Sequence, residues 1–432
     1  MQLPPLVLAL VALSLSVGCG SDKDDTEDTA ETGTPDTDTG NTGFDPTGPC
    51  DGGTWGAIAD PENAIHVRAD GSDDGDGSVE SPLASIAAAL ELTRARAEDR
   101  IIALGPGTFE TNIILAHDLG DGRSDDGTTI QGCSAAETLL EDATAASVIS
   151  VHAAQDVVVE GICTHGGKRG ILISSAASAS LSDVVIEEAY GVGLLVLGNG
   201  TQVTLAGVEV YGTLPFTDGN NGYGLAFQEG AAVAMSGGGA YDNTGIGILI
   251  SDVDDVSLSG VAVEGTLQDG DGLFGRGVQI QDYAVNVAIE DLTLADNHDA
   301  GLFALRTQVL TMSGCTITGT LAGTAPDSGD ATGDGIVVSR GDGNLNPGDY
   351  VATLEGNTVT GSARAGIVID GTTTAVSAND LSANGFTQDG TSLVSQGPAA
   401  VSGDDTVAAL EEAEALSLNL EPAATVELTD AP

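Results

Sequence analysis

One side chain in this 432-residue sequence stands out as a candidate general base. Lys168 is the only lysine after residue 49, and it lies next to Arg169 and three residues after His165. A lysine amine can act as a base when it is held beside its substrate. Because no ordered set of carboxylates accompanies it, the segment Gly166-Gly-Lys-Arg-Gly is also typical of a solvated turn.

Four acids form a second candidate site. Two carboxylates at a suitable separation can cleave a glycosidic bond, one as the proton donor and the other as base or nucleophile. Asp269 and Asp271 lie in one Gly-rich segment, and Asp330 and Asp334 lie in another. Since 65 residues of the chain are Asp or Glu, such a coincidence is expected often here and is weak evidence for catalysis.

An Asp- and Gly-rich segment at residues 70–77 is the best candidate for a metal site. Calcium prefers several oxygen ligands on a turning backbone, and this segment offers the carboxylates of Asp70, Asp73, Asp74 and Asp76. An EF-hand is excluded, because Ser81 stands where that loop needs a bidentate Glu. The alternative to a calcium loop of another kind is a solvated turn.

The elements that would position these residues repeat along the chain. A glycine followed by alternating apolar residues recurs at Gly170, Gly193, Gly224, Gly247, Gly277, Gly301, Gly335 and Gly366. A second phrase, such as Leu205-Ala-Gly-Val-Glu-Val, alternates with the first. Alternation with a period of two is typical of strands, and a repeat of roughly 22 residues is too short to add a crossover helix. The pattern therefore predicts a right-handed solenoid of stacked parallel strands.

With these repeats the sequence resembles right-handed parallel β-helix proteins of the pectin-lyase-like type, which include pectate lyases, polygalacturonases and many surface adhesins. The resemblance implies an all-β chain whose right-handed, single-stranded parallel β-helix occupies residues 131–403. Residues 50–130 would form an N-terminal cap with the first strands, and residues 404–432 a C-terminal cap or tail. Catalytic members of this type use a Lys or Arg base with calcium, or clustered aspartates with a His and an Arg-x-Lys. Neither pattern is found here, and one fold hosts many functions.

Both ends of the solenoid are predicted to be closed by helices. Ser81 followed by Pro82 is typical of a helix start, and the apolar positions Leu83, Ile86 and Leu90 give one buried face of a helix ending near Arg96. A second short helix is expected at 406–416. Inside the solenoid, the inward positions of Asn357 and Asn379 predict side chains that bond to each other at a turn.

An apolar row is predicted to face outward from the Gly-led strands. The middle outward position of these strands is occupied by Leu172, Leu195, Ala226, Leu249, Gln279, Phe303, Val337 and Val368. The row consists of the six large apolar residues among them, Leu172, Leu195, Leu249, Phe303, Val337 and Val368. Such a row is unexpected on a soluble surface. Either loops or the C-terminal tail fold over it, or it is the floor of a binding stripe for a glycan or a protein partner.

Three insertions begin with the same tripeptide and are expected to project from one edge. They start at Gly212, Gly265 and Gly319, which are 53 and 54 residues apart, or two rungs of the solenoid. Insertions on a single edge of a solenoid often build its binding face.

The N-terminus is typical of an exported protein. Residues 1–18 form an apolar stretch too short to span a bilayer, and they end in Ser16-Val-Gly-Cys19. This segment resembles a bacterial lipoprotein signal, which implies lipidation of Cys19 and sorting to the outer membrane or cell surface; the alternative is plain secretion. Residues 19–49 are acidic and almost free of apolar residues, so they are predicted to be a disordered tether.

The net charge limits the classes of binding partner, and the cysteines limit the possible disulfide bonds. The formal net charge of −53 excludes nucleic acid and anionic membrane surfaces as partners, and calcium or high salt would relieve the self-repulsion. Export permits disulfides, and Cys50 can pair with Cys133 or Cys163, a choice the sequence leaves open. Cys315 is predicted to be buried. We therefore expect a surface lipoprotein with a structural or binding role, against a calcium-dependent polysaccharide lyase or glycosidase, or an adhesin or assembly module, as alternatives.

Overall fold

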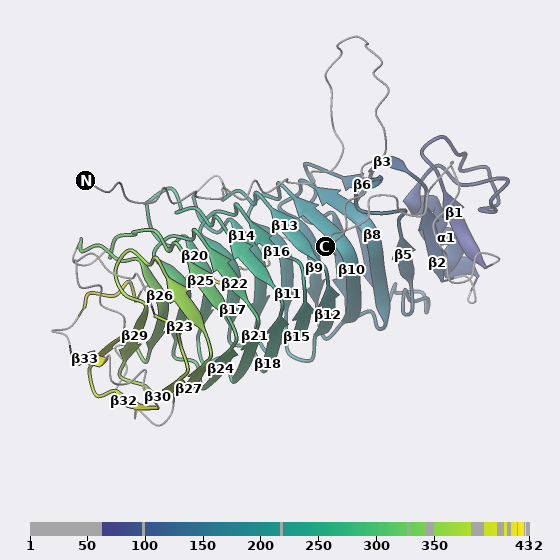
Figure 1. The fold of residues 1–432 in the computed structure, drawn as a ribbon. Helices are drawn as coiled ribbons and strands as arrows, with labels where there is room; N and C mark the ends of the chain where they lie inside the picture. The colour runs from purple at the N-terminus through teal and green to yellow at the C-terminus, as the bar shows by residue number, and fades with distance from the viewer. Residues whose placement is uncertain are drawn as a thin grey trace, which may run out of the picture.

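The chain folds as a right-handed parallel β-helix whose rungs stack along one axis (Figure 1). The structure is a computed structural model and describes residues 63–96, 100–216, 219–325, 329–341, 350–381, 393–403, 410–412, 416–420, 422–426 and 428. The predicted signal segment, Cys19 and the tether lie outside the described residues. No described helix is long and apolar enough to cross a membrane.

Each rung contributes a strand to sheet B, a sheet of twelve parallel strands among the described residues. In spatial order these strands are β4 (Ile113–Ala116), β7 (Ile149–His152), β9 (Arg169–Ser174), β11 (Val192–Leu197), β14 (Tyr223–Gln228), β17 (Ile246–Ser251), β20 (Arg276–Gln281), β23 (Ala300–Leu305), β26 (Asp334–Ser339), β29 (Ile367–Asp370), β31 (Leu393–Gln396) and β33 (Leu410–Glu412).

The other strands form sheet A, in which the rungs from β2 to β28 run through two columns. The first column contains β1 (Ala64–Val67), β2 (Ile101–Leu104), β5 (Thr129–Gln131), β8 (Val157–His165), β10 (Ser178–Glu187), β12 (Gln202–Ala206), β15 (Ala232–Ser236), β18 (Asp255–Ser259), β21 (Asn286–Glu290), β24 (Val309–Ser313), β27 (Val351–Glu355), β30 (Thr373–Ser377) and β32 (Ala400–Gly403). The second contains β3 (Gly107–Glu110), β6 (Thr138–Glu141), β13 (Glu209–Tyr211), β16 (Gly239–Tyr241), β19 (Ala262–Glu264), β22 (Thr293–Ala295), β25 (Thr316–Thr318) and β28 (Thr358–Thr360). The long strands β8 and β10 pass through both columns.

The repeated glycines are explained by the close approach of one rung to the next. A Cβ built on Gly247 would lie 2.7 Å from the carbonyl oxygen of Gly277 and 2.2 Å from the side chain of Val263. Gly277 stands at the equivalent position of the following rung, and its own Cβ would lie 2.6 Å from the carbonyl oxygen of Gly301. The glycines at the start of the sheet B strands from β9 to β26 are therefore needed for space, and the predicted solenoid is confirmed.

We expect Gly247→Ala to lower the free energy of unfolding by roughly 1–3 kcal/mol, because the added methyl group overpacks a fully buried contact. The urea midpoint followed by circular dichroism measures the loss. Gly270→Ala is the matched control, since a Cβ at Gly270 meets nothing within 4 Å. Equal effects of the two substitutions would contradict the packing explanation.

Buried asparagines hold two of the turns. Asn357 donates from its side chain to Asn379 Oδ1 at 2.9 Å, as predicted, and accepts from the backbone N–H of Cys315 at 3.0 Å. The sequence analysis missed a second set at another corner. There Asn243 and Asn297 each accept from one backbone N–H and donate to one backbone carbonyl of the preceding rung. These asparagines have a structural role, because their side chains form hydrogen bonds to the backbone of the turns.

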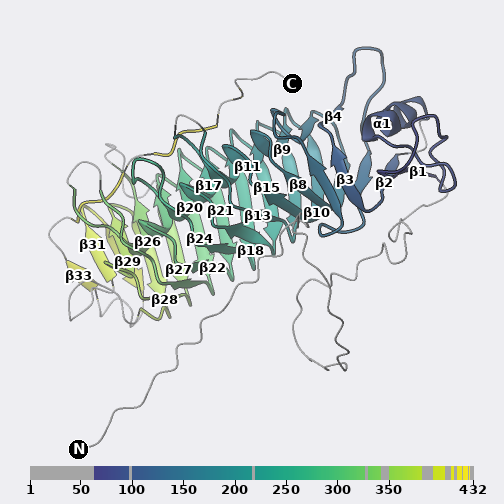
Figure 2. The same cartoon turned by 90° about the horizontal axis from the view of Figure 1, so that it is seen from above.

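The N-terminal end carries one helix, α1 (Ile86–Ala95), whose buried face includes Ile86 and Leu90 (Figure 2). The cap is confirmed, but its predicted start was wrong. The N-cap is Ser85, whose Oγ accepts from the N–H of Ala88, and Leu83 instead forms a bridge to Val67. The bridge extends the first strand region, so the helix begins four residues later than Ser-Pro would place it.

The C-terminal end of the solenoid is a strand where a helix was predicted. The predicted helix at 406–416 was wrong for residues 410–412, which form strand β33 and pair with β31. Parallel pairing with the preceding rung satisfies the hydrogen bonds of this backbone in place of helical bonds.

Cys315 is a buried free thiol, as predicted, and Cys133 and Cys163 are both disulfide-bonded. Cys50 lies outside the described residues.

Candidate functional site

Lys168 does not form one site with the candidate acids Asp269 and Asp271. Lys168 is exposed in the turn before β9, and Asp269 and Asp271 lie in the insertion before β20. Sheet B orders the strands β9, β11, β14, β17 and β20, so four rungs separate the lysine from the acids. At about 4.8 Å per rung this is roughly 19 Å along the axis, too far for one proton-transfer site.

The acids have structural partners instead. Asp269 Oδ1 accepts from the backbone N–H groups of Leu273 at 2.7 Å and Asp271 at 3.1 Å, which closes its own loop, and burial raises its pKa. Asp334 is buried in an ion pair with Arg364, whose Nε donates at 2.9 Å. Asp330 accepts from the hydroxyl of Ser417. These contacts give the carboxylates of Asp269, Asp330 and Asp334 structural roles, whereas Asp271 contributes its backbone N–H.

The Asp-rich segment at residues 70–77 holds the N-terminal cap together. Asp73 accepts from the backbone N–H of Ala84 at 3.0 Å and from the N–H and hydroxyl of Ser85 at 2.9 and 2.8 Å. Asp70 pairs with Arg68, and Asp76 accepts from the N–H of Ser78. Asp74 has its own backbone N–H bonded to Ser72. Within the described part of the chain no three His, Cys, Asp or Glu side chains are grouped to hold a metal ion.

The bond from the Ser85 hydroxyl is the main reason that the pKa of Asp73 lies below its usual range. A carboxylate with a lowered pKa stabilises the fold fully above its unfolded pKa, and the stabilisation is lost as pH falls through the folded pKa. We expect amide exchange in α1 to speed up as pH falls below about 4, after correction for intrinsic rates. Asp73→Ala is expected to remove this step and to weaken the cap by about 0.5 kcal/mol, at the low end for capping because the site is exposed. An unchanged pH profile in Asp73→Ala would contradict this role.

The apolar row faces outward from sheet B, as predicted, but it is covered. Its six members are between 0% and 3% exposed, namely Leu172, Leu195, Leu249, Phe303, Val337 and Val368. Residues 416–420 and 422–426, called here the C-terminal segment, lie over them (Figure 2). The prediction of an exposed binding stripe was therefore wrong, and the alternative of a covering tail is confirmed. The row is called the stripe below.

The C-terminal segment covers the stripe in two parts. Leu416, Leu418 and Leu420 pack against the part around Phe303 and Val337. Ala423 and Val426 pack against the part formed by the strands β9 to β17. Between the two parts, strand β20 presents polar side chains in place of apolar ones. The segment therefore crosses an apolar, a polar and a second apolar zone.

The polar zone is a fully buried network around Arg276. Its Nε donates to Asp299 at 2.6 Å, its Nη1 to Gln279 at 2.8 Å, and its Nη2 to the backbone carbonyl of Asn419 at 2.6 Å. The guanidinium also lies 4.0 Å from the centre of the Phe303 ring. A buried charge is tolerated only when its hydrogen bonds are satisfied, and here the C-terminal segment supplies one acceptor. This network was not expected from the sequence, because the acceptor that closes it, Asn419, is 143 residues from Arg276.

The insertions recur on one edge, as predicted. Leu214, Leu267 and Leu321 occupy equivalent positions, where each bridges to the residue of the preceding rung, and each is 40–49% exposed. They are separated by short turns at the rungs between them. The exposed leucines are single residues two rungs apart, which is common on protein surfaces.

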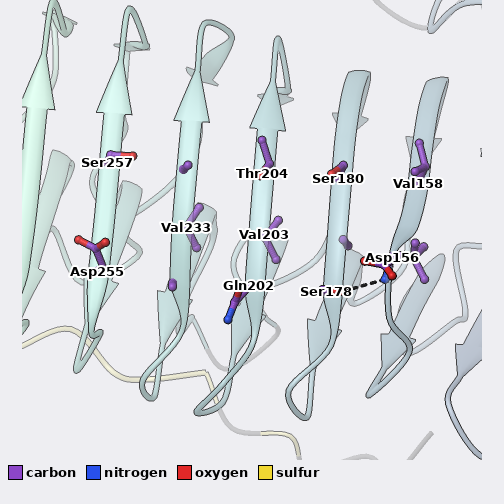
Figure 3. Close-up of a pocket in the computed structure, with 14 residues that line it drawn as sticks. Asp156, Val158, Ser178, Ser180, Gln202, Val203, Thr204, Val233, Asp255 and Ser257 are labelled. Atoms are coloured by element: carbon purple, nitrogen blue, oxygen red, sulfur yellow. Dashed lines mark hydrogen bonds between the residues drawn. The ribbon is translucent and has the colours of Figure 1, made fainter. Parts of the chain in front are cut away.

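The described surface is hollowed on the first column of sheet A. A shallow hollow of about 440 Å³ spans β8, β10, β12, β15 and β18 (Figure 3). Hydroxyl, amide and carboxylate groups point into it from Ser180, Thr204, Gln202, Asp255 and Ser257. Ala234 on β15 is one of its lining residues and is exposed. The signal for this face was present in the sequence, since small and polar residues alternate with Val and Leu along these strands.

Comparisons with known proteins agree with the architecture. The family model described as a right handed beta helix region matches residues 169–345, in agreement with the right-handed parallel β-helix of the structure. Among solved structures, the Dettilon tailspike protein is 12% identical, with a TM-score of 0.49 over 82% of this chain and 71% of the tailspike. The pectate lyase Pel9A is 14% identical, with a TM-score of 0.48 over 73% of this chain and 78% of the lyase.

The catalytic domain of a GH87 alpha-1,3-glucanase, solved in complex with tetrasaccharides, is 11% identical, with a TM-score of 0.44 over 83% of this chain and 69% of that domain. No curated protein sequence matches this chain. At these identities the similarity concerns the fold alone.

Proposed function

We propose that the protein is a non-catalytic, cell-surface module that binds a glycan in the hollow on sheet A. The observation that supports this proposal is the hollow itself, in which hydroxyl, amide and carboxylate groups from four of its five rungs face solvent. Such groups are suited to the hydroxyls of a sugar chain. The structural partners of Asp269 and Asp334 argue against turnover at these two carboxylates.

The charge of the chain narrows the ligand class. A formal net charge of −53 repels polyanions at moderate salt, so uronate polymers are poor ligands. The hollow is lined by Asp156 and Asp255 and by no basic side chain. The expected ligand is therefore a neutral glycan or one that carries amino groups.

A glycan array with the exported chain tests this function. We expect binding to neutral or amino-bearing glycans and at least a tenfold loss in affinity for Ala234→Leu, which fills the hollow without adding charge. Ala288→Leu is the matched control, because Ala288 faces outward two rungs further along the same row, outside the hollow. Equal losses for both variants, or no glycan bound by the parent chain, would overturn the proposal.

Display on the cell surface is a separate part of the proposal. It is supported by the apolar run that ends in Gly18-Cys19 and by the acidic tether that follows. Cys19→Ser is expected to move the protein from the membrane fraction to the soluble fraction, because the lipid would have no attachment site. Fractionation followed by immunoblotting measures this, and unchanged membrane association would contradict anchoring through Cys19.

A further inference from the structure

The outer face of sheet B holds an extended polypeptide by its main chain. Gln281 donates to the carbonyl of Ala423 at 2.9 Å and accepts from the N–H of the same residue at 2.8 Å. Gln396 repeats this paired contact with the N–H and carbonyl of Leu416, at 2.7 and 3.2 Å. Each glutamine amide thus satisfies one donor and one acceptor of a single residue, as a neighbouring strand would.

Further side chains, from sheet B and from the loop before β29, bond to the same main chain. Arg364 donates to the carbonyl of Ser417 at 2.8 Å, and the Tyr223 hydroxyl donates to the carbonyl of Ala424 at 3.1 Å. Gln228 accepts from the N–H of Val426 at 3.2 Å. Together with the contact from Arg276 to Asn419, these bonds recognise an extended backbone, while the stripe takes alternate apolar side chains. This division of labour is typical of peptide-binding surfaces.

The direction of the C-terminal segment is well defined. It begins at Gln396 on β31, passes Gln281 on β20 and reaches Gln228 on β14, so it runs from the last rungs back toward the first (Figure 2). It also follows β33, the last strand of the solenoid, in the chain. The C-terminal segment therefore begins on the stripe at the same end of the solenoid as β33.

We propose that the stripe and its glutamines are a binding site for an extended apolar peptide, filled at rest by the C-terminal segment and able to take the same segment from a second copy of the chain. When two copies meet at their C-terminal ends, each segment can enter the stripe of the other copy at β31 and run toward β14 in the same direction. All the contacts described above are then re-formed between copies. Exchange of an identical element is a low-cost route to a dimer for this reason.

Charge and concentration set the conditions for exchange. The intramolecular segment competes at an effective concentration near the millimolar range, so exchange requires concentrated protein or a weakened resident segment. Two chains with a net charge of −53 repel each other, and salt screens this repulsion. The exchanged dimer is therefore expected to increase with protein concentration and with salt.

A complementation experiment with full-length chains tests the proposal. One copy carries Leu418→Asp and Leu420→Asp, which disable its segment and leave its stripe intact. The other copy carries Val337→Asp, which disables its stripe and leaves its segment intact. We expect each copy alone to be monomeric in size-exclusion chromatography with light scattering, and a mixture in high salt to form a 1:1 dimer.

Substitution of a clamping glutamine adds a specificity control. Gln281→Ala in the copy with the intact stripe is expected to weaken the mixed dimer at least tenfold, whereas Gln202→Ala on sheet A leaves it unchanged. A mixture that stays monomeric, or a copy with a disabled segment that dimerises with itself, would overturn the proposal. If a variant fails to fold, a labelled peptide of residues 416–426 is added to the unmodified chain, where slow saturable uptake supports the proposal and no uptake refutes it.

Discussion

Replacing Arg276 by alanine is expected to lower the free energy of unfolding by about 3–5 kcal/mol. The guanidinium is fully buried, and its removal leaves the carboxylate of Asp299 and the carbonyl of Asn419 without their charged partner. The contact with the Phe303 ring is lost as well. Urea unfolding followed by circular dichroism measures the change in midpoint.

Arg306→Ala provides the matched control for this prediction. Arg306 forms an ion pair with Asp282 at 3.1 Å, and both side chains are partly exposed. Pairs of this kind contribute about 0–1 kcal/mol, because water and salt screen them. If both arginine substitutions had the same small effect, the Arg276 network would be open to solvent rather than sealed by the C-terminal segment.

Phe303→Ala is expected to cost about 3–5 kcal/mol as well, since it removes a ring that is only 2% exposed on the outside of the solenoid. The ring packs against Val337 and the leucines of the C-terminal segment, so its loss also loosens the cover. Limited proteolysis is therefore expected to cleave the C-terminal segment faster in this variant. Unfolding and proteolysis together measure the contribution of the stripe.

Val309→Ala is the control on the same rung, because Val309 also faces outward but is 44% exposed. Its effect is expected to stay within about 0.5 kcal/mol. An uncovered stripe would make the two substitutions equivalent. A large difference between them is the result that separates a sealed face from an open binding surface.

Because the stripe is covered, its apolar side chains are not accessible to a partner in this structure. An apolar row on one face of a solenoid would be a site of aggregation, and the C-terminal segment removes it. Among the described residues, the polar hollow on sheet A and the edge with the insertions remain open to a partner. The function proposed for the hollow and the exchange proposed for the stripe thus use different faces of one scaffold.

The distances between the candidate catalytic residues could not be predicted from the sequence. Lys168, Asp269 and Asp271 were chosen by residue type, and four rungs separate Lys168 from the two acids. Asp73 was chosen as a metal ligand, and it caps a helix through Ser85. Residue types predict what a side chain can do, whereas its distance from the next candidate depends on how many rungs lie between them.

The sequence alone determined the solenoid, the outward apolar row and the Asn357–Asn379 contact, because these features repeat from rung to rung and each rung contacts its neighbours. Only the tertiary structure decided that residues 416–426 cover the row and that Arg276 lies beneath them. The bond from Arg276 to Asn419 joins residues 143 positions apart, and that from Gln228 to Val426 spans 198. Periodicity describes contacts between successive rungs, but it carries no information on which face a non-repeating segment will cover.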